Sequence, residues 1–183
     1  MSAAAQTLVN DFSIHVATVN GSGSQTANST LLRSIFTMGV PVSGKNLFPS
    51  NIQGLPTWFT IRVNAHGYIA RKAANDLLIC MNPETAVDDV KTVRSGAAVI
   101  YDEPLGLNKL RDDLQFFPVP FGKIIAAACP DAKLRKLVTN MIYVGVAARM
   151  LHIDMAQVKA ALGKQLGGKA KAIVHNEAAL DAG

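Results

Sequence analysis

The chain has 183 residues, of which 49% are hydrophobic, 17% charged and 6% aromatic. This length and apolar content predict one domain over residues 1–183 rather than two. The net charge is +5, and because Lys and Arg are spread along the chain, this mild basicity does not choose among an anionic small ligand, an acidic partner surface and nucleic acid. The low charged fraction and positive mean hydropathy favour a subunit of a larger assembly.

The cysteines and the apolar runs exclude two further classes. Cys80 and Cys129 are far apart in the sequence and lie in apolar segments, which predicts buried, reduced thiols. Two cysteines cannot hold an iron–sulfur cluster or a zinc finger within this chain alone. No apolar run approaches the ~20 residues that a membrane span needs, and the N-terminus lacks the features of a signal peptide. We therefore expect a cytoplasmic protein that does not cross a membrane.

The first predicted elements are a strand, a glycine-rich turn and a helix. Residues 12–19 alternate between apolar and small or polar side chains, which is typical of a strand. Residues 25–38 place apolar side chains at helical spacing and stop before Gly39. This order is the opening of a βα unit.

The middle of the chain continues the alternation of strands and helices. After a polar loop over residues 43–58, a helix is predicted within residues 82–93, where Asn82 can cap and Pro83 suits the first helical position. The further predicted strands are residues 58–63, 76–81, 95–102 and 113–120. This pattern predicts an α/β fold, a three-layer Rossmann-like domain with a mainly parallel sheet.

The pattern becomes helical from residue 131 onward. Residues 131–151 are predicted as one helix and residues 153–167 as a second, capped by Asp154. Residues 169–183 form a third predicted helix, which ends without a stop signal. We expect this last helix to be a linker toward a following domain or a partner.

The turn between the first strand and the first helix, Gly-Ser-Gly-Ser at residues 21–24, is the first candidate site. Its backbone N–H groups and hydroxyls at a helix N-terminus favour an anion such as phosphate. It departs from the dinucleotide pattern, because Thr26 stands at the third glycine position, and no acidic residue follows about twenty residues later to hold a ribose. Anion binding and a plain tight connection both stay open, and NAD binding is disfavoured.

The polar segment over residues 43–58 is the second candidate. It is long and rich in amide side chains, and long ordered loops often have a function. Lys45, Asn46, Asn51 and Gln53 could contact a ligand or a neighbouring subunit. Simple turn formation by Asn, Gly and Pro is the alternative.

No catalytic or metal-binding group is predicted. The four histidines have no acid or nucleophile at a telling spacing. Two adjacent acidic pairs, at residues 88–89 and 112–113, would point apart, which is typical of helix surface.

Four stretches resemble a known family when they are taken together. They are residues 20–64, beginning NGSGSQTANSTLLRS, residues 76–90, DLLICMNPETAVDDV, residues 96–103, GAAVIYDE, and residues 140–153, NMIYVGVAARMLHI. In this order they resemble the gamma domain of 2-oxoacid:ferredoxin oxidoreductases, the pyruvate and 2-oxoglutarate enzymes. The resemblance is closest to the gamma domain that begins a fused alpha chain of 2-oxoglutarate-type enzymes, and residues 176–183 resemble the junction where that fusion continues.

The glycine loop follows this family in part. The family commonly has Gly-x-Gly-Gly-Gln-Gly; Gly21, Gly23 and Gln25 match it, whereas Ser24 and Thr26 replace glycines. Serine and threonine restrict the close backbone approach that glycine allows, but their hydroxyls can still donate to an anion.

The resemblance implies a fold like domain III of pyruvate:ferredoxin oxidoreductase and a role inside a complex. The complex cleaves a 2-oxoacid on thiamine diphosphate with magnesium, passes electrons through 4Fe–4S clusters to ferredoxin, and transfers the acyl group to coenzyme A. The alpha and beta partner subunits would hold thiamine and the clusters, and nucleic acid has no part. This chain would help to bind coenzyme A, with Lys45 facing a phosphate. The implied contacts are Asn20, Gly21, Ser22, Gly23, Ser24, Gln25, Lys45, Asn46, Asn51 and Gln53.

Two other functions stay open at this stage. The chain could be a purely structural interface domain of the same complex, in which partner subunits hold coenzyme A. It could also be an independent nucleotide-binding protein with a Rossmann-like fold, although the missing ribose acid argues against this.

Overall fold

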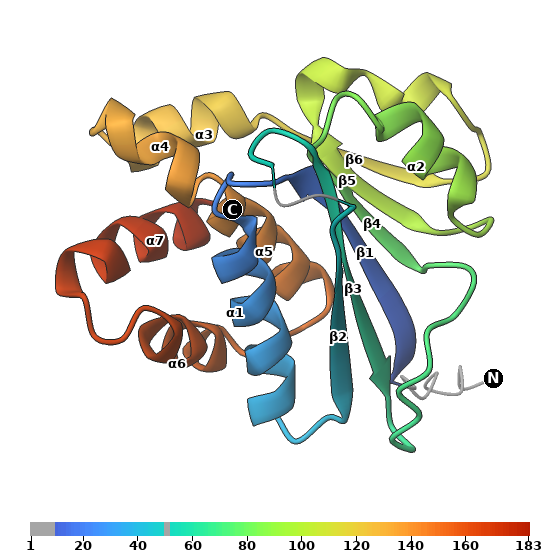
Figure 1. Cartoon of the computed structure of the whole chain (residues 1–183), viewed down its shortest axis with the longest axis horizontal. Helices are drawn as coiled ribbons and strands as arrows, with labels where there is room; N and C mark the ends of the chain where they lie inside the picture. The colour runs from blue at the N-terminus through green and yellow to red at the C-terminus, as the bar shows by residue number, and fades with distance from the viewer. Residues whose placement is uncertain (1–9, 50–51) are drawn as a thin grey trace, which may run out of the picture.

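A computed structural model describes residues 10–49 and 52–183. Its centre is a six-stranded sheet in the order β2-β3-β1-β4-β5-β6 (Figure 1). The strands are β1 (Asp11–Val19), β2 (Val42–Leu47), β3 (Pro56–Asn64), β4 (Leu77–Cys80), β5 (Ala98–Asp102) and β6 (Gln115–Val119).

The sheet is mixed, with a parallel part and an antiparallel part. Strands β1, β4, β5 and β6 are parallel to one another. Strand β3 pairs with β1 in the antiparallel sense, and β2 extends that part as the edge. Pro118 is tolerated in β6 because β6 is the opposite edge strand, where a missing N–H costs no ladder hydrogen bond. The α/β class that the sequence predicts is confirmed.

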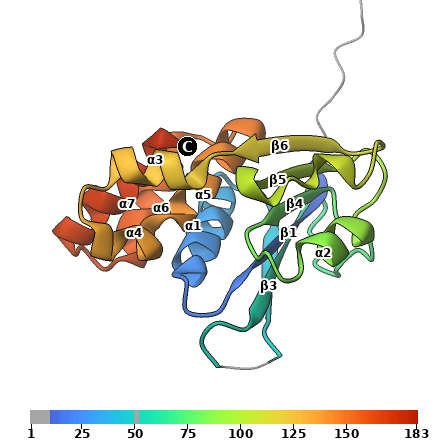
Figure 2. The ribbon, with the colours of Figure 1, turned by 90° about the horizontal axis from the view of Figure 1, so that it is seen from above.

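Helices cover both faces of the sheet, which gives three layers (Figure 2). Helices α1, α5, α6 and α7 lie on one face, and α2 lies on the other (Figures 1 and 2). The helices are α1 (Ser24–Thr37), α2 (Ala86–Thr92), α3 (Phe121–Ala128), α4 (Ala132–Val138), α5 (Asn140–Met150), α6 (Met155–Gln165) and α7 (Ala170–Ala182), with 3₁₀ turns η1 (Glu103–Leu105) and η2 (Leu107–Lys109).

Each face of the sheet has its own core cluster. The larger cluster joins side chains of α1 and α5 to the sheet and includes Leu31, Ile142 and Ile14. The smaller cluster lies under α2. The buried free thiols that the sequence predicts are confirmed: Cys129 belongs to the larger cluster and Cys80 to the smaller.

The prediction of a polar loop over residues 43–58 is wrong for the first part of this segment. Strand β2 occupies Val42–Leu47 and pairs with β3. The prediction missed it because β2 is an exposed edge whose stability comes from main-chain pairing rather than from apolar alternation. Gly44 faces α1, and a Cβ at this position would lie 2.3 Å from Leu32 Cδ1 and 2.7 Å from Phe59 Cζ, so a larger residue would force these side chains to move.

The prediction of a single helix over residues 131–151 is also wrong. It is divided into α4 and α5 at Thr139, whose hydroxyl donates to the Arg135 carbonyl at 2.6 Å. A Thr hydroxyl bonded in this way competes with the regular helix pattern and bends the backbone. Helix α3, which the sequence pattern did not predict, precedes this pair.

The other helix predictions agree more closely with the structure. Helices α6, capped by Asp154, and α7 are confirmed. Helix α2 begins at Ala86 rather than Pro83. Asn82 does accept from the Glu84 N–H, at 3.0 Å, but this bond closes a turn that precedes the helix.

Helix α7 packs tightly against α5 within the domain. A Cβ at Gly145 of α5 would lie 2.2 Å from the carbonyl oxygen of Leu180, so only glycine allows this approach. The role of residues 169–183 as a linker stays a prediction.

The start of β1 contains an ion pair that makes stability depend on pH. Hydrogen bonds from Asn64, Lys72 and Arg62 hold the pKa of Asp11 below its ordinary value of 3.8. A carboxylate with a lowered pKa stabilises the fold above the unfolded pKa and loses this contribution as the pH falls through the folded pKa. We expect Asp11→Asn to lower the free energy of unfolding at pH 7, and to have less effect as the pH falls below about 4.

Denaturant unfolding at pH 7 and at pH 3 measures this effect. Asp88→Asn is the control, because Asp88 forms an exposed ion pair with Lys91 and should change stability little. Equal losses for Asp11→Asn at both pH values would contradict the expectation.

Candidate functional site

The β1–α1 loop, residues 20–23, lies at the carboxyl end of β1 and leads into the N-terminus of α1. Gly21 and Gly23 have φ angles of +79° and +86°, a left-handed conformation that glycine adopts without steric cost. No side chain of the described residues caps α1, so its first N–H groups keep their capacity to bind an anion. Ligands of open α/β sheets bind at this end of the strands.

Two segments far away in the sequence hold this loop. The Asn20 N–H donates to the Leu55 carbonyl at 2.9 Å, and the Gly54 N–H donates to the Asn20 carbonyl at 3.0 Å. From the other side, Asn140 Nδ2 of α5 donates to the Ser22 carbonyl at 2.7 Å. The β2–β3 connection and the break between α4 and α5 therefore both fix the loop.

A cavity of about 280 Å³ opens beside the loop, and we call it the loop cavity. It is lined by Asn20, Gly21, Gly23, Ser24, Gln25, Asn28, Asn46, Thr57 and Trp58. Six of the ten predicted contacts thus come together, and Asn46 Nδ2 donates to Gln25 Oε1 at 3.3 Å across the cavity. No carboxylate, imidazole or thiol is among the described residues that line it. The cavity offers neutral donors and backbone N–H groups, which suit a ligand rich in acceptors.

The remaining predicted contacts lie in different places. Gln53 packs against the loop, since a Cβ at Gly21 would lie 2.8 Å from Gln53 Cγ. Ser22 lines a second cavity that is described below. Asn51 lies outside the described residues.

Lys45 lies on the other side of the sheet from the loop cavity. It follows Gly44, which faces α1, and precedes Asn46, which reaches Gln25, so its side chain leaves from the opposite face of β2. Lys45 is in register with Thr60, which lines a separate polar cavity on that face. The phosphate contact expected of Lys45 stays a prediction.

Asn28 and Tyr143 are site residues that the sequence did not reveal. Asn28 lines the loop cavity with 3% of its surface exposed, and Tyr143 of α5 is fully buried. The Tyr143 hydroxyl donates to Asn28 Oδ1 at 2.8 Å. Burial raises the pKa of Tyr143, so the hydroxyl stays protonated and remains a donor.

This bond orients the amide of Asn28. With its oxygen bound by Tyr143, Asn28 keeps an amide nitrogen that has no hydrogen-bond partner among the described residues. The nitrogen can therefore donate to a ligand in the loop cavity. The two residues are 115 positions apart, so no local pattern could have linked them.

The second cavity beside the loop, which we call the strand-end cavity, has a volume of about 180 Å³. It lies where β1 and β4 end and where α4 meets α5. Its lining residues are Thr18, Val19, Ser22, Met81, Lys136, Thr139 and Asn140. The break at Thr139 thus brings polar groups of the helical layer to the carboxyl ends of two parallel strands.

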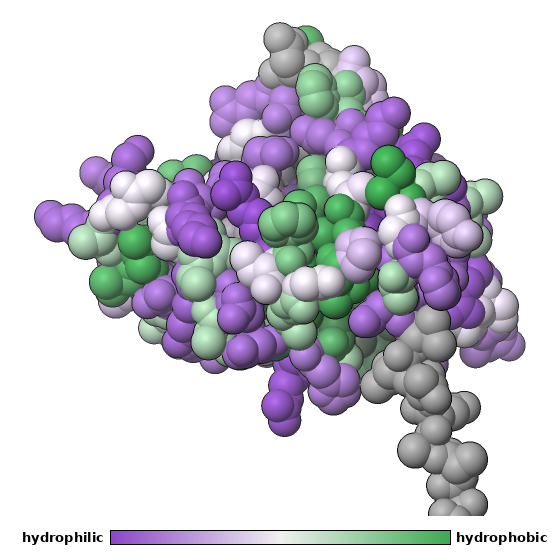
Figure 3. All heavy atoms as spheres, turned by 90° about the horizontal axis from the view of Figure 1, so that it is seen from below, coloured by the Kyte–Doolittle hydropathy of each residue, from purple (hydrophilic) through white to green (hydrophobic). Residues whose placement is uncertain are grey.

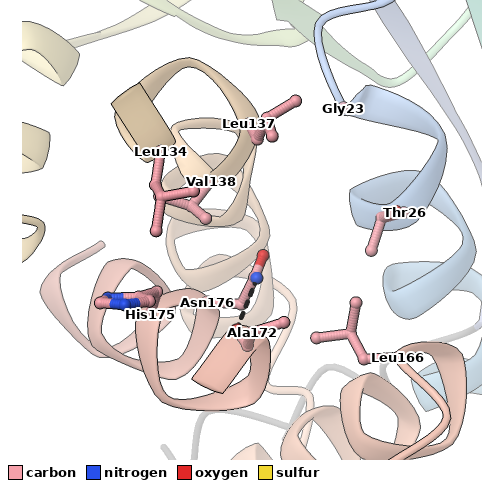
Figure 4. A pocket seen from close by; sticks show the side chains of 9 residues that line it. All are labelled: Gly23, Thr26, Leu134, Leu137, Val138, Leu166, Ala172, His175 and Asn176. Carbon is pink, nitrogen blue, oxygen red and sulfur yellow. Dashed lines mark hydrogen bonds between the residues drawn. The ribbon is translucent and has the colours of Figure 1, made fainter. Parts of the chain in front are cut away.

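A third, mainly apolar cavity of about 250 Å³ lies on the far side of Gly23 (Figure 4). Leu134, Leu137 and Val138 of α4 surround it, together with Thr26 of α1 and Leu166 after α6. Gly23 lines this cavity and the loop cavity alike, so its backbone separates an apolar space from a polar one.

The part of the chain that the structure describes contains neither a metal-binding cluster nor a membrane-spanning helix. No cluster of three or more His, Cys, Asp or Glu side chains could hold a metal ion in residues 10–49 and 52–183. Within the same ranges, no helix has the length and apolar character to span a membrane.

The chain is similar to known proteins in sequence. Residues 13–183 match the family described as pyruvate ferredoxin/flavodoxin oxidoreductase. A curated relative, subunit alpha of 2-oxoacid:ferredoxin oxidoreductase 2 from Aeropyrum pernix, is 21% identical over 159 residues, which are 86% of this chain and 25% of that protein. The chain therefore spans about a quarter of the length of this relative.

Three solved structures share the fold. One is 2-oxoglutarate:ferredoxin oxidoreductase from Magnetococcus marinus with 2-oxoglutarate, coenzyme A and succinyl-CoA bound, with a TM-score of 0.76 at 20% identity, over 94% of this chain and 30% of that chain. The gamma subunit of keto/oxoacid ferredoxin oxidoreductase from Geobacter sulfurreducens gives a TM-score of 0.71 at 15% identity, over 93% and 95%. Pyruvate oxidoreductase subunit PORC from Thermotoga maritima gives 0.72 at 14% identity, over 94% of each chain.

These structures establish the likeness of fold, and the family match establishes the relationship. The match extends from the third residue of β1 to the last residue of the chain. The chain therefore belongs to the pyruvate ferredoxin/flavodoxin oxidoreductase family.

Proposed function

We propose that this chain is the gamma component of a 2-oxoacid:ferredoxin oxidoreductase. The complex would convert 2-oxoglutarate or a related 2-oxoacid to the acyl-CoA by oxidative decarboxylation. Within it, this chain would contribute coenzyme A binding and subunit packing. The observation that supports this role best is the loop cavity, where a left-handed glycine loop, a helix N-terminus and the oriented amide of Asn28 meet.

Coenzyme A fits the chemistry of this cavity. Its phosphates, amides and hydroxyls are acceptors, and the groups around the cavity are mostly neutral donors. The volume of about 280 Å³ is at the lower limit of small-molecule pockets, so it would hold one section of the molecule. The Magnetococcus marinus enzyme of the same fold has coenzyme A bound, which makes this ligand the natural candidate.

The chain's own residues would bind and orient the ligand. Asn28 would donate from its amide nitrogen, held in place by Tyr143, while the N–H groups of Ser24 and Gln25 at the start of α1 would face acceptor oxygens. Fixing the ligand in this way lowers the entropic cost of bringing its thiol to the reacting centre.

The redox chemistry would belong to partners. When bound in those partners, thiamine diphosphate with magnesium would supply the electron sink for decarboxylation, and 4Fe–4S clusters would conduct the electrons to ferredoxin. We assign these groups to the alpha and beta subunits or domains of the complex. Cys80 and Cys129 lie in core clusters on opposite faces of the sheet, which does not suit shared ligation of one cluster.

A second candidate function is packing alone, and an apolar face favours it. Figure 3 shows apolar side chains gathered around a hollow on the face where α1 ends. Phe36 is 66% exposed and Met38 42% exposed on this side of the molecule. The hollow, of about 210 Å³, is lined mainly by Phe12, Ile35, Met38, Val40, Val63, Leu151 and Ile153. Exposed apolar surface of this kind is typical of a subunit interface.

Anaerobic affinity purification of the tagged chain from its native cells tests the proposal. Mass spectrometry identifies the partners, and reduction of a viologen by 2-oxoglutarate or pyruvate measures the activity of the purified complex. Thiamine- and cluster-bearing partners with coenzyme-A-dependent reduction are the expected result. A lone chain without partners would contradict the proposal and would favour an independent nucleotide-binding protein.

A further inference from the structure

The strand-end cavity contains two polar side chains whose hydroxyls are unsatisfied. Thr18, on the α1 face of β1, is only 2% exposed, and its Oγ1 has no hydrogen-bond partner among the described residues. The same is true of Ser22 Oγ, which is also shielded from solvent. Both residues line this one cavity of about 180 Å³. Because a buried hydroxyl without a partner is costly, two of them beside one cavity indicate a bound group that accepts hydrogen bonds.

The charge at this cavity is positive. Lys136 of α4 lines it, and no described residue forms an ion pair with this lysine. No carboxylate is among the described lining residues. The α1 helix begins two residues after Ser22, and its dipole adds positive potential on the same side of the loop.

The position of the cavity also favours a ligand. It lies at the carboxyl ends of the parallel strands β1 and β4, next to the point where the sheet changes from parallel to antiparallel. The strand-end cavity and the loop cavity adjoin the same short loop, residues 20–23. One extended ligand could therefore contact both cavities. Asn140 fixes the shared wall by its hydrogen bond to the Ser22 carbonyl.

We propose that the strand-end cavity is an anion subsite in which Thr18, Ser22 and Lys136 bind a phosphate group of coenzyme A. Two hydroxyl donors and one ammonium match the oxygens of a phosphate. The inference rests on the proposed function, because it takes coenzyme A as the ligand of the loop cavity. It assigns the phosphate contact to Lys136, whereas Lys45 lies on the opposite face of the sheet.

Two variants of the purified complex test the subsite. We expect Lys136→Ala to raise the KM for coenzyme A about tenfold with little change in kcat, since hydrogen bonds to charged groups contribute strongly to binding. Thr18→Val keeps the shape of the side chain and should also raise this KM. Because the lost hydroxyl has no partner in the protein, Thr18→Val should leave the midpoint of thermal unfolding unchanged or higher.

Pantetheine, which has no phosphate, is the discriminating probe. Its inhibition constant against coenzyme A should be the same for the wild type, Lys136→Ala and Thr18→Val. Lys133→Ala, an exposed lysine of α4 that does not line the cavity, is the matched control and should change neither constant. Lys45→Ala tests the competing assignment in the same assay.

The outcomes separate the two proposals. An unchanged KM for coenzyme A in Lys136→Ala and Thr18→Val overturns the subsite, and so does an equal loss of pantetheine binding. Tyr143→Phe acts on the loop cavity. If it raises the KM for coenzyme A while Lys136→Ala and Thr18→Val do not, the proposed subsite is contradicted and coenzyme A binding in the loop cavity is supported. If all three leave the KM unchanged, coenzyme A binding by this chain fails as well.

Discussion

Replacing Gly23 by alanine is expected to be among the most destabilising single changes in this chain. Gly23 has a φ of +86°, which costs an L-residue about 1–2 kcal/mol. The added Cβ would also lie 2.6 Å from the backbone carbonyl oxygen of Leu137, which cannot rotate away as a side chain can. With a further cost of about 1–3 kcal/mol for overpacking, we expect a total loss of about 2–5 kcal/mol in the free energy of unfolding.

Gly39→Ala is the matched control for this prediction. Gly39 has a φ of +80°, and an added Cβ would meet nothing within 4 Å. We expect this variant to lose only the conformational cost of about 1–2 kcal/mol. Denaturant unfolding of both variants measures the difference. If the two losses are equal, the contact between Gly23 and α4 is not rigid, and the geometry of the loop is less constrained than the structure indicates.

Tyr143→Phe is expected to affect stability and ligand binding together. The change removes the hydroxyl that donates to Asn28 Oδ1 and leaves a buried acceptor unpaired, at a cost of about 1–3 kcal/mol. Since Asn28 then loses its fixed orientation, we also expect the KM for coenzyme A in the complex to rise about tenfold at a cost of about 1.4 kcal/mol in binding. Chemical denaturation of the chain and steady-state kinetics of the complex measure the two effects.

Tyr101→Phe is the control for the loss of a tyrosine hydroxyl. Tyr101 is buried in the smaller core cluster, edge-on to Phe116, and its hydroxyl has no hydrogen-bond partner among the described residues. We expect this variant to change stability by less than about 0.5 kcal/mol and the KM not at all. A KM that stays unchanged in Tyr143→Phe, despite the expected loss of stability, would mean that Asn28 supports the fold but does not contact coenzyme A.

Much of the fold could be predicted because its causes are local. The alternation in residues 12–19, the helical spacing in residues 25–38 and the Asp154 cap each depend on neighbours within one or two turns, and all three predictions are confirmed. The glycine loop is a local feature of the same kind, because positions 21 and 23 have a left-handed backbone that glycine adopts most easily. These patterns were sufficient for the α/β class.

Other parts of the fold depend on pairing that no local pattern encodes. Strand β2 has no apolar alternation and forms because β3 offers it a ladder of main-chain partners. Nothing in residues 56–64 indicates that β3 should run antiparallel to β1. The break at Thr139 follows from a side-chain bond within a segment whose apolar spacing is continuous.

For the candidate site, the sequence by itself determined the glycine loop, the amide-rich segment and the family they resemble. The tertiary structure decided how these parts meet. It placed Asn46 in the loop cavity and Lys45 on the opposite face, because successive side chains of a strand alternate. It also brought Asn28 to Tyr143, and Thr18 to the cavity that Lys136 lines. The physical reason is that the last two pairs, Asn28 with Tyr143 and Thr18 with Lys136, are more than 100 positions apart and are brought together by packing of the helical layer on the sheet, whereas the sequence patterns report only on near neighbours.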